Sequence, residues 1–355
     1  MSEEYIRVVE LSMAGARLQP AEADKLEKTV EADPSDADAR VKLAAFYFGR
    51  SIWSVPSQEQ WFRHIFWFIE NRPDHELLGD PEARLFFRNE VRALFDTGKS
   101  LWQTQLERNP NSAKLYFHAA NYLERTDWSA AFRFLEEAVR LEPANDKWKD
   151  RLAFACELAS SSHNNNGELE RAFALRWELL DSVPSQSEDR ASRLADFIEP
   201  AYRLGKFSEC ETAARSIIEI SSLEECSPAD LHKAHSFIGL VQLRKNDVSG
   251  ACKSLLASGT VGTYPTLATF GPSFKLARAL LKIGERKTVL KYLEHCSTFW
   301  ESGQIFLAYW WVIIALGRSP DLNKVGAVEL LLPRSLNPVV RYVFSLGLKR
   351  SNKVG

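Results

Sequence analysis

Glycine and proline are scarce in this sequence, at 17 and 15 of 355 residues. An antiparallel sandwich or barrel needs turn residues roughly every 8–12 positions. No stretch alternates apolar and polar residues in the way a half-buried strand does. The scarcity of turn residues and the missing strand pattern exclude a large β-fold, and we predict an all-α protein.

Cysteine is also rare, and no two cysteines are spaced as C-x-x-C. The odd number, five, excludes complete pairing into disulfides. We therefore expect reduced and mostly buried thiols in a cytoplasmic protein. They are Cys156, Cys210, Cys226, Cys252 and Cys296.

A long apolar run and a basic region are missing as well. The N-terminal residues start acidic and contain no uninterrupted apolar core, so we expect no secretory signal. The most apolar run, residues 305–316, is shorter than the roughly 20 residues that cross a bilayer, and we expect it to be a buried helix. The net charge is -2, with lysine and arginine scattered. Without a long apolar run, we expect no membrane partner. Nucleic-acid binding needs a basic face that neutralises phosphates, so we expect no nucleic-acid partner either.

The sequence contains none of the motifs that carry common enzyme chemistry, such as phosphate-binding glycine loops, H-E-x-x-H or G-x-S-x-G. Cys226, His232 and His235 form the best metal-like cluster, but zinc needs further ligands that are not nearby. His295 and Cys296 are adjacent on a predicted helix and point about 100° apart, so they cannot act as base and nucleophile. We predict no catalytic residue, no metal, no cofactor and no enzyme activity.

Prolines recur at intervals of 33–41 residues, each after a stretch with helical periodicity. Proline cannot continue a helix, so these positions mark regularly spaced helix ends. The links after three of them carry the candidate N-cap residues Asp36, Ser112 and Asn145. A helix end followed at once by a helix start predicts stacked antiparallel hairpins. The recurring prolines are Pro34, Pro73, Pro110, Pro143 and Pro184.

Residues 112–145 form the clearest hairpin. Small residues at 119 and 131 let the two predicted helices approach closely, and larger apolar residues surround that contact. The positions that carry the pattern are Leu115, Ala119, Tyr122, Trp128, Ala131, Leu135, Ala138 and Pro143. This unit resembles the tetratricopeptide repeat (TPR), a 34-residue helix–turn–helix.

The resemblance implies a right-handed superhelical solenoid of stacked antiparallel helical hairpins. It divides the chain into divergent, aromatic-rich hairpins (1–110), the best-matching units (111–222), C-terminal TPR-like hairpins (223–345) and a tail (346–355). Within the second segment, residues 160–167 read as a polar loop between two helices. Residues 306–332 read as a further hairpin near the end of the array.

The TPR resemblance also implies a function. Repeats of this family bind peptides or helices on a concave surface lined by the first helix of each hairpin. Carrying those lining positions over gives Tyr116, Ala120, Leu123, Asp150, Phe154, Glu157, Glu199 and Tyr202. We therefore expect a non-enzymatic protein-binding scaffold or adaptor whose partner is a peptide or helical segment of another protein. The mixed apolar and acidic stripe favours an apolar or basic segment.

The aromatic segment at residues 53–68 leaves an alternative open. It contains Trp61, Phe62, Phe66, Trp67 and Phe68. Aromatic side chains are common both in protein cores and at binding hot spots. If these side chains line a pocket, the chain is instead a helical ligand-sensing or enzyme-associated domain that encloses a small molecule.

Overall fold

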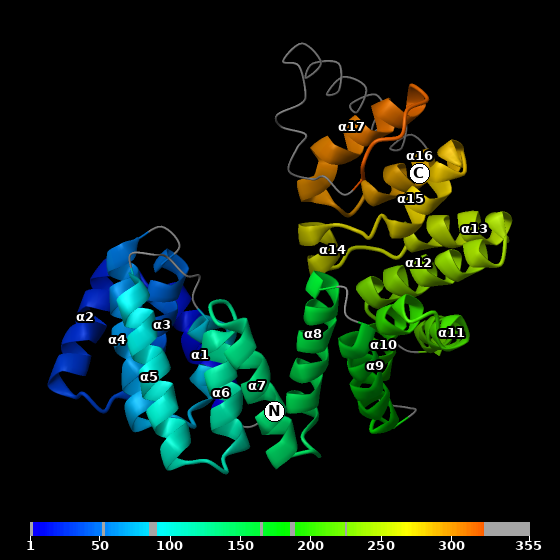
Figure 1. Cartoon of the computed structure of the whole chain (residues 1–355). Helices are drawn as coiled ribbons and strands as arrows, with labels where there is room; N and C mark the ends of the chain where they lie inside the picture. The colour runs from blue at the N-terminus through cyan, green and yellow to red at the C-terminus, as the bar shows by residue number, and fades with distance from the viewer. Residues whose placement is uncertain are drawn as a thin grey trace. The chain divides into compact units, whose positions relative to one another are not determined.

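The all-α prediction is confirmed by a computed structural model, which describes residues 3–51, 54–84, 91–163, 166–184, 189–223 and 226–322. No strand occurs in these residues. The chain forms two compact units, Met1–Leu158 and Ala159–Gly355, and the boundary falls inside one helix (Figure 1). Each unit is described by itself. No helix of the described residues is long and apolar enough to cross a membrane.

The helices of the first unit follow one another with short links. They are α1 (Glu3–Ala16), α2 (Pro20–Ala32), α3 (Ala37–Ser51), α4 (Val55–Asn71), the 3-10 turns η1 (Glu76–Gly79) and η2 (Pro81–Ala83), α5 (Arg92–Arg108), α6 (Ala113–Leu123), α7 (Trp128–Leu141) and the first part of α8 (Asp146–His163). Helices α1 and α2 both pack against α3, and from α3 to α7 each helix packs against the next.

The second unit continues from the end of α8. Its helices are α9 (Asn166–Asp181), α10 (Arg190–Arg203), α11 (Phe207–Leu223), α12 (Pro228–Arg244), α13 (Val248–Ser258), α14 (Pro265–Phe270), α15 (Lys275–Lys282), α16 (Arg286–Cys296), the 3-10 turn η4 (Glu301–Gly303) and α17 (Gln304–Ala315). Consecutive helices from α9 to α13 pack in pairs, and so do α15 with α16 and α16 with α17.

The helix ends lie where the prolines predict them. Helices α2, α4, α5, α7 and α9 each stop two or three residues before a recurring proline. Two of the three predicted N-caps are also present, since Asp36 Oδ1 accepts a hydrogen bond from Ala39 N and Asn145 Oδ1 accepts one from Lys147 N. Ser112 also stands at the N-cap position, of α6, but its side chain does not make the predicted capping hydrogen bond.

The contact predicted between α6 and α7 is buried. Ala119 and Ala131 are at most 1% exposed, and Leu115 and Leu135 are each 5% exposed around them. Small side chains at the centre of the pair allow the close approach that the pattern predicted.

The loop predicted at residues 160–167 is mostly helical. Helix α8 runs on to His163, and α9 begins at Asn166. Ser160 is buried, and its hydroxyl accepts a hydrogen bond of 2.8 Å from Arg203 of α10. This tertiary contact keeps the polar stretch in the helix, where local composition favoured a loop.

The apolar run at residues 305–316 forms a helix, α17, but only one face of it is buried. Leu307, Trp310 and Ile314 lie in the core, while Ile305 and Leu316 are exposed. The second half of the hairpin predicted at residues 306–332 falls largely outside the described residues, as does the tail.

Candidate functional site

The predicted groove residues of the first unit lie on α6 and α8 and differ in accessibility. Ala120 and Leu123 are at most 2% exposed, so they contribute to the core and not to a surface. Tyr116 is half-buried and packs edge-on against Phe134 of α7, with ring centroids 5.7 Å apart. Tyr116 therefore packs within its own hairpin. Phe154 is exposed.

Asp150 and Glu157, also on α8, are half-buried. They lie one turn to either side of Phe154 along the helix, which places them within reach of the same face. Leu158, one turn beyond Phe154, is 40% exposed and extends the apolar strip.

The predicted groove residues of the second unit are engaged in contacts within that unit. Glu199 forms an ion pair with Lys275 of α15. Burial raises the pKa of Glu199, but the charge and hydrogen bond of Lys275 outweigh it, so the net shift is downward. Tyr202 lies between Phe207 and Phe237, with both ring centroids 5.4 Å away. Tyr202 is thus a packing residue of α10, α11 and α12.

A pocket lies where α6, α7 and α8 meet in the first unit. It is small, with about 10 Å³ of space open to a water-sized molecule, which is room for about one water. Its walls are mainly apolar, and two charged side chains stand among them. The lining residues are Phe117, Ala120, Asn121, Glu124, Trp128, Ala131, Leu135, Arg151, Phe154 and Ala155.

The charged side chains of the pocket form a cluster. One oxygen of Glu124 accepts hydrogen bonds from both Arg84, at 2.7 Å, and Arg151. Burial lowers the pKa of the Arg151 guanidinium, and the nearby Arg84 acts in the same direction against the attraction of Glu124. The Arg151 guanidinium also lies 5.5 Å from the ring centroid of Phe154. Arg151 therefore holds the exposed ring against the charged edge of the pocket.

The pocket combines apolar and charged groups in a small space. The pocket offers an apolar hollow, an exposed aromatic ring and an ion cluster, and it holds no nucleophile or histidine. Such a combination of an apolar centre and a polar rim is typical of a surface that receives one anchor side chain of a partner.

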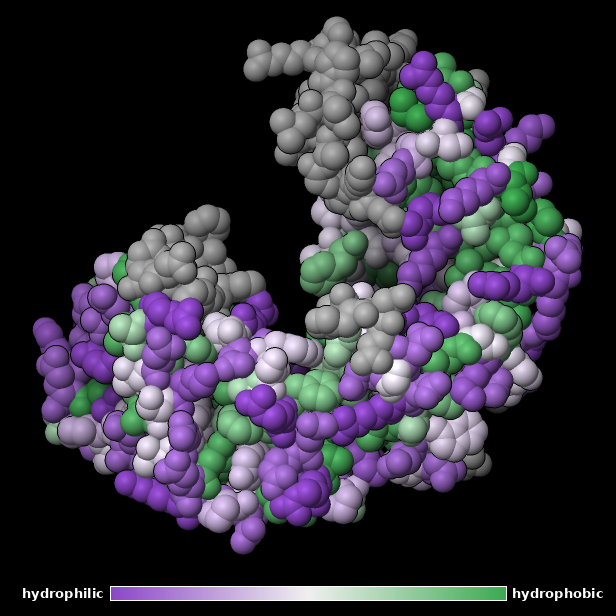
Figure 2. Space-filling model, in the orientation of Figure 1, coloured by the Kyte–Doolittle hydropathy of each residue, from purple (hydrophilic) through white to green (hydrophobic). Residues whose placement is uncertain are grey.

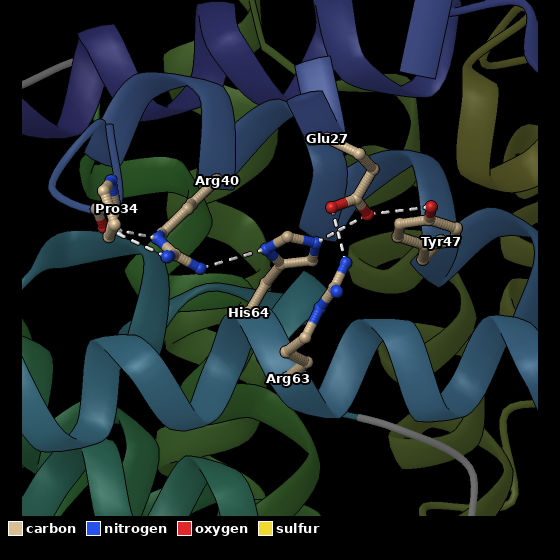
Figure 3. Close-up of polar contacts among 6 residues, drawn as sticks. All are labelled: Glu27, Pro34, Arg40, Tyr47, Arg63 and His64. Carbon is tan, nitrogen blue, oxygen red and sulfur yellow. Dashed lines mark hydrogen bonds and ion pairs between the residues drawn. The ribbon is translucent and has the colours of Figure 1, made fainter. Parts of the chain in front are cut away.

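A second polar constellation links α2, α3 and α4, as Figure 3 shows. Glu27 accepts hydrogen bonds from Tyr47 Oη at 2.9 Å and from Arg63. His64 Nε2 lies 3.1 Å from Glu27 Oε1, and Arg40 Nη1 lies 3.5 Å from His64 Nδ1. A neutral imidazole that carries its proton on Nε2 satisfies both contacts, because it donates to Glu27 and accepts from Arg40.

Arg40 extends the network to the link between α2 and α3. Its Nε and Nη2 donate hydrogen bonds to the carbonyl oxygen of Pro34, at 3.1 and 3.0 Å. The guanidinium also lies 4.6 Å from the ring centroid of Trp67. Arg40 thus fixes the start of α3 against α4.

The charge states of this network indicate a structural role. Burial raises the pKa of Glu27, but hydrogen bonds from His64 and Tyr47 and the charge of Arg63 outweigh it and lower the pKa to about 2. Burial lowers the pKa of His64 more than Glu27 raises it. A carboxylate paired with a neutral histidine would suit acid–base chemistry, but the His64 side chain is fully buried and out of reach of a substrate.

The metal-like cluster of the sequence does not form a site. Both ring nitrogens of His232 are occupied: Nδ1 lies 2.8 Å from the carbonyl oxygen of Ser258, and Nε2 accepts from Ser273 N at 2.9 Å. Among the described residues, no group of three or more metal-binding side chains occurs. Cys296 is fully buried and burial raises the pKa of its thiol, so it is not a nucleophile.

Comparisons with known proteins add little. No family model matches the chain, and no curated protein matches it. Among solved structures, the crystal structure of BtubC (BKLC) from P. vanneervenii is 15% identical, covers 75% of this chain and 95% of that chain, and superimposes with a TM-score of 0.40.

Proposed function

We propose that this chain is a non-enzymatic scaffold that binds a peptide or helical segment of another protein at the α6–α8 pocket. The observation that carries the proposal is Phe154, which is 39% exposed beside an apolar pocket with an arginine–glutamate cluster at its edge. The hairpins are proposed to be turns of a TPR-like solenoid, which the packing of each helix on the next supports.

The proposed mode of binding follows from the pocket. An apolar side chain of the partner packs against the exposed ring of Phe154 at the mouth of the pocket, which itself has room for about one water molecule. Phe154 gains contact area on binding. The guanidinium of Arg151 is already held by Glu124, so it adds orientation to the interface with little loss of side-chain freedom.

The alternative of a small-molecule site in the aromatic segment is less well supported. Trp61, Phe62 and Phe68 are at most 2% exposed, so these side chains fill the core. Trp61 and Phe62 pack edge-on with ring centroids 5.0 Å apart, and Phe68 contacts His75 at 4.6 Å. Buried rings that pack against one another are typical of a protein core, which favours the core interpretation of residues 54–68.

None of the five cysteines forms a disulfide in the structure. Reduced thiols, three of them buried, support the proposal that the protein works in a reducing compartment such as the cytoplasm.

A peptide selection tests the proposal. The full chain is used to select binders from a displayed library of random 16-residue peptides, and the affinity of the enriched peptides is measured by fluorescence anisotropy. Phe154→Ala is expected to weaken their binding about tenfold, because the loss of an aromatic anchor often costs about 1–2 kcal/mol.

The matched control is Phe270→Ala, since Phe270 on α14 is 81% exposed and belongs to the second unit. It should leave the affinity unchanged. Circular dichroism confirms that both variants keep their helices. Enriched peptides that bind Phe154→Ala as well as the wild type would contradict docking at this pocket.

A further inference from the structure

Three aromatic rings of the first unit surround one ammonium group. Nζ of Lys147 lies 5.7 Å from the ring centroid of Tyr5, 5.2 Å from that of Phe117 and 5.6 Å from that of Trp148. A carboxylate oxygen of Glu76 lies 3.8 Å from the same nitrogen. The rings come from α1, α6 and α8 and the carboxylate from η1, so four separate segments converge on one cation.

Two rings of this aromatic cage and its carboxylate are held in place without Lys147. Phe117 and Trp148 are each 5% exposed and pack together with ring centroids 4.2 Å apart. Trp148 Nε1 donates a hydrogen bond of 2.8 Å to Glu142. Glu76 forms a closer ion pair, at 2.8 Å, with Lys114. These three groups are therefore preformed.

The Lys147 side chain itself is held only weakly in the cage. It is 49% exposed, and its 3.8 Å contact with Glu76 is too long for a hydrogen bond. A bare ammonium gains most from direct hydrogen bonds to oxygen, and the three rings offer it none.

The dimensions of the cage fit a methylated ammonium better than a bare one. A methyl group extends about 1.5 Å from its nitrogen, the length of an N–C bond. Carbon atoms in contact lie about 3.5–4.0 Å apart. A methyl carbon that lies between the nitrogen and a ring face thus requires a nitrogen-to-ring distance of about 5.0–5.5 Å. The observed distances from Lys147 Nζ to the three ring centroids are 5.2–5.7 Å. Faces of aromatic rings also attract a diffuse cation that has no proton to donate.

We propose that Tyr5, Phe117, Trp148 and Glu76 form a recognition site for the methylated ammonium of a lysine side chain, and that Lys147 occupies this site in the free protein. The present occupant shows that a four-carbon stem reaches the cage. One oxygen of Glu76 pairs with Lys114, and the other faces the cage, where it attracts a cation and disfavours the phosphate of a choline headgroup. This favours a methylated lysine of a polypeptide over a lipid. The site shares Phe117 with the α6–α8 pocket but does not require a partner there.

Isothermal titration calorimetry of the full chain with Nα-acetyl-trimethyllysine methylamide tests the proposal. We expect this compound to bind about fivefold or more tightly than its unmethylated form and than a neutral analogue with a tert-butyl group in place of the trimethylammonium. Lys147→Ala is expected to tighten binding about threefold or more, because it removes the competing occupant. Lys149→Ala on the same helix is the matched control and should have no effect.

Tyr5→Ala removes one wall and is expected to weaken binding about threefold, while circular dichroism and the melting temperature report whether the fold is kept. Equal affinity for the charged and neutral compounds would overturn the proposal, since it would indicate apolar contact alone. Unchanged affinity in Lys147→Ala would also overturn it. So would binding to phosphatidylcholine vesicles without binding to the trimethyllysine compound.

Discussion

Replacing Gly15 with alanine is expected to lower the free energy of unfolding of the first unit by about 3 kcal/mol. A Cβ atom at this position would lie 2.2 Å from the carbonyl oxygen and 2.7 Å from the Cα of Lys42. Both are backbone atoms of α3, so no side-chain rotation relieves the clash. Gly15 lies on the face of α1 that buries Val8 and Ser12, and α1 must shift away from α3 to accommodate a methyl group.

Gly49→Ala is the matched control for this effect. Gly49 lies in α3, and a Cβ atom there meets nothing within 4 Å. Alanine costs less backbone entropy than glycine in a helix, so this variant should be more stable by about 0.5–1 kcal/mol. Urea unfolding followed by tryptophan fluorescence measures both. Similar changes in the two variants would show that α1 does not contact α3 as described.

Lowering the pH from 7.5 to 5 is expected to destabilise the protein, with His75 and His118 contributing about 2 kcal/mol each. Burial lowers the pKa of each to about 4, from 6.5 in the unfolded chain. For a histidine with a lowered pKa, the unfolded state binds the proton first. Stability is therefore complete above pH 6.5 and is lost as the pH falls toward 4.

The geometry gives the reason that both histidines stay neutral. His75 Nδ1 accepts a hydrogen bond from Leu77 N at 3.3 Å, and a proton on this atom would remove it. His118 Nδ1 lies 3.0 Å from the carbonyl oxygen of Pro73, and its Nε2 is buried without a partner. Protonation of His118 would leave an unpaired charge in the core.

His118→Gln separates the two contributions. Glutamine can still donate to the Pro73 carbonyl but does not titrate, so the loss of stability between pH 7.5 and 5 should be smaller by about 2 kcal/mol. Urea unfolding at several pH values measures this difference, which does not depend on the absolute stability of the variant. If the free energy of unfolding of the wild type does not change between pH 7.5 and 5, the lowered pKa values assigned to His75 and His118 are contradicted.

The secondary structure could largely be predicted from the sequence because its signals are local. Helices end before Pro73 and Pro143 since proline cannot continue them, and the apolar spacing of residues 112–145 matches the buried face of α6 and α7. The stretch 160–163 was misread because its helical state depends on the contact of Ser160 with Arg203, 43 residues away.

The sites could not be predicted in the same way, because they depend on contacts between distant residues. The aromatic cage joins Tyr5 to Lys147, and the pocket cluster joins Arg84 to Glu124. No spacing in the sequence indicates these pairs. Tyr116 and Tyr202 illustrate the opposite error, since their positions in the repeat predicted a groove but their rings pack against Phe134 and Phe207 within their own hairpins.

Apolar side chains are scattered over the visible surface of the chain (Figure 2). Hydrophilic and apolar side chains are interspersed over the visible face, as Figure 2 shows. Two large exposed apolar side chains nevertheless lie one turn apart on α8, where Phe154 and Leu158 are 39% and 40% exposed. This pair distinguishes the α8 strip from single exposed residues, which need no functional explanation.

Hydrogen exchange of the full chain, with and without a selected peptide, tests the central claim most directly. A bound segment slows exchange by stabilising the helices that it contacts. Docking at the α6–α8 pocket predicts slower exchange in α6, α7 and the first part of α8, and unchanged exchange in α14 around the exposed Phe270. Protection confined to α4, with none in α6 to α8, would contradict the account and place the binding site in the aromatic segment instead.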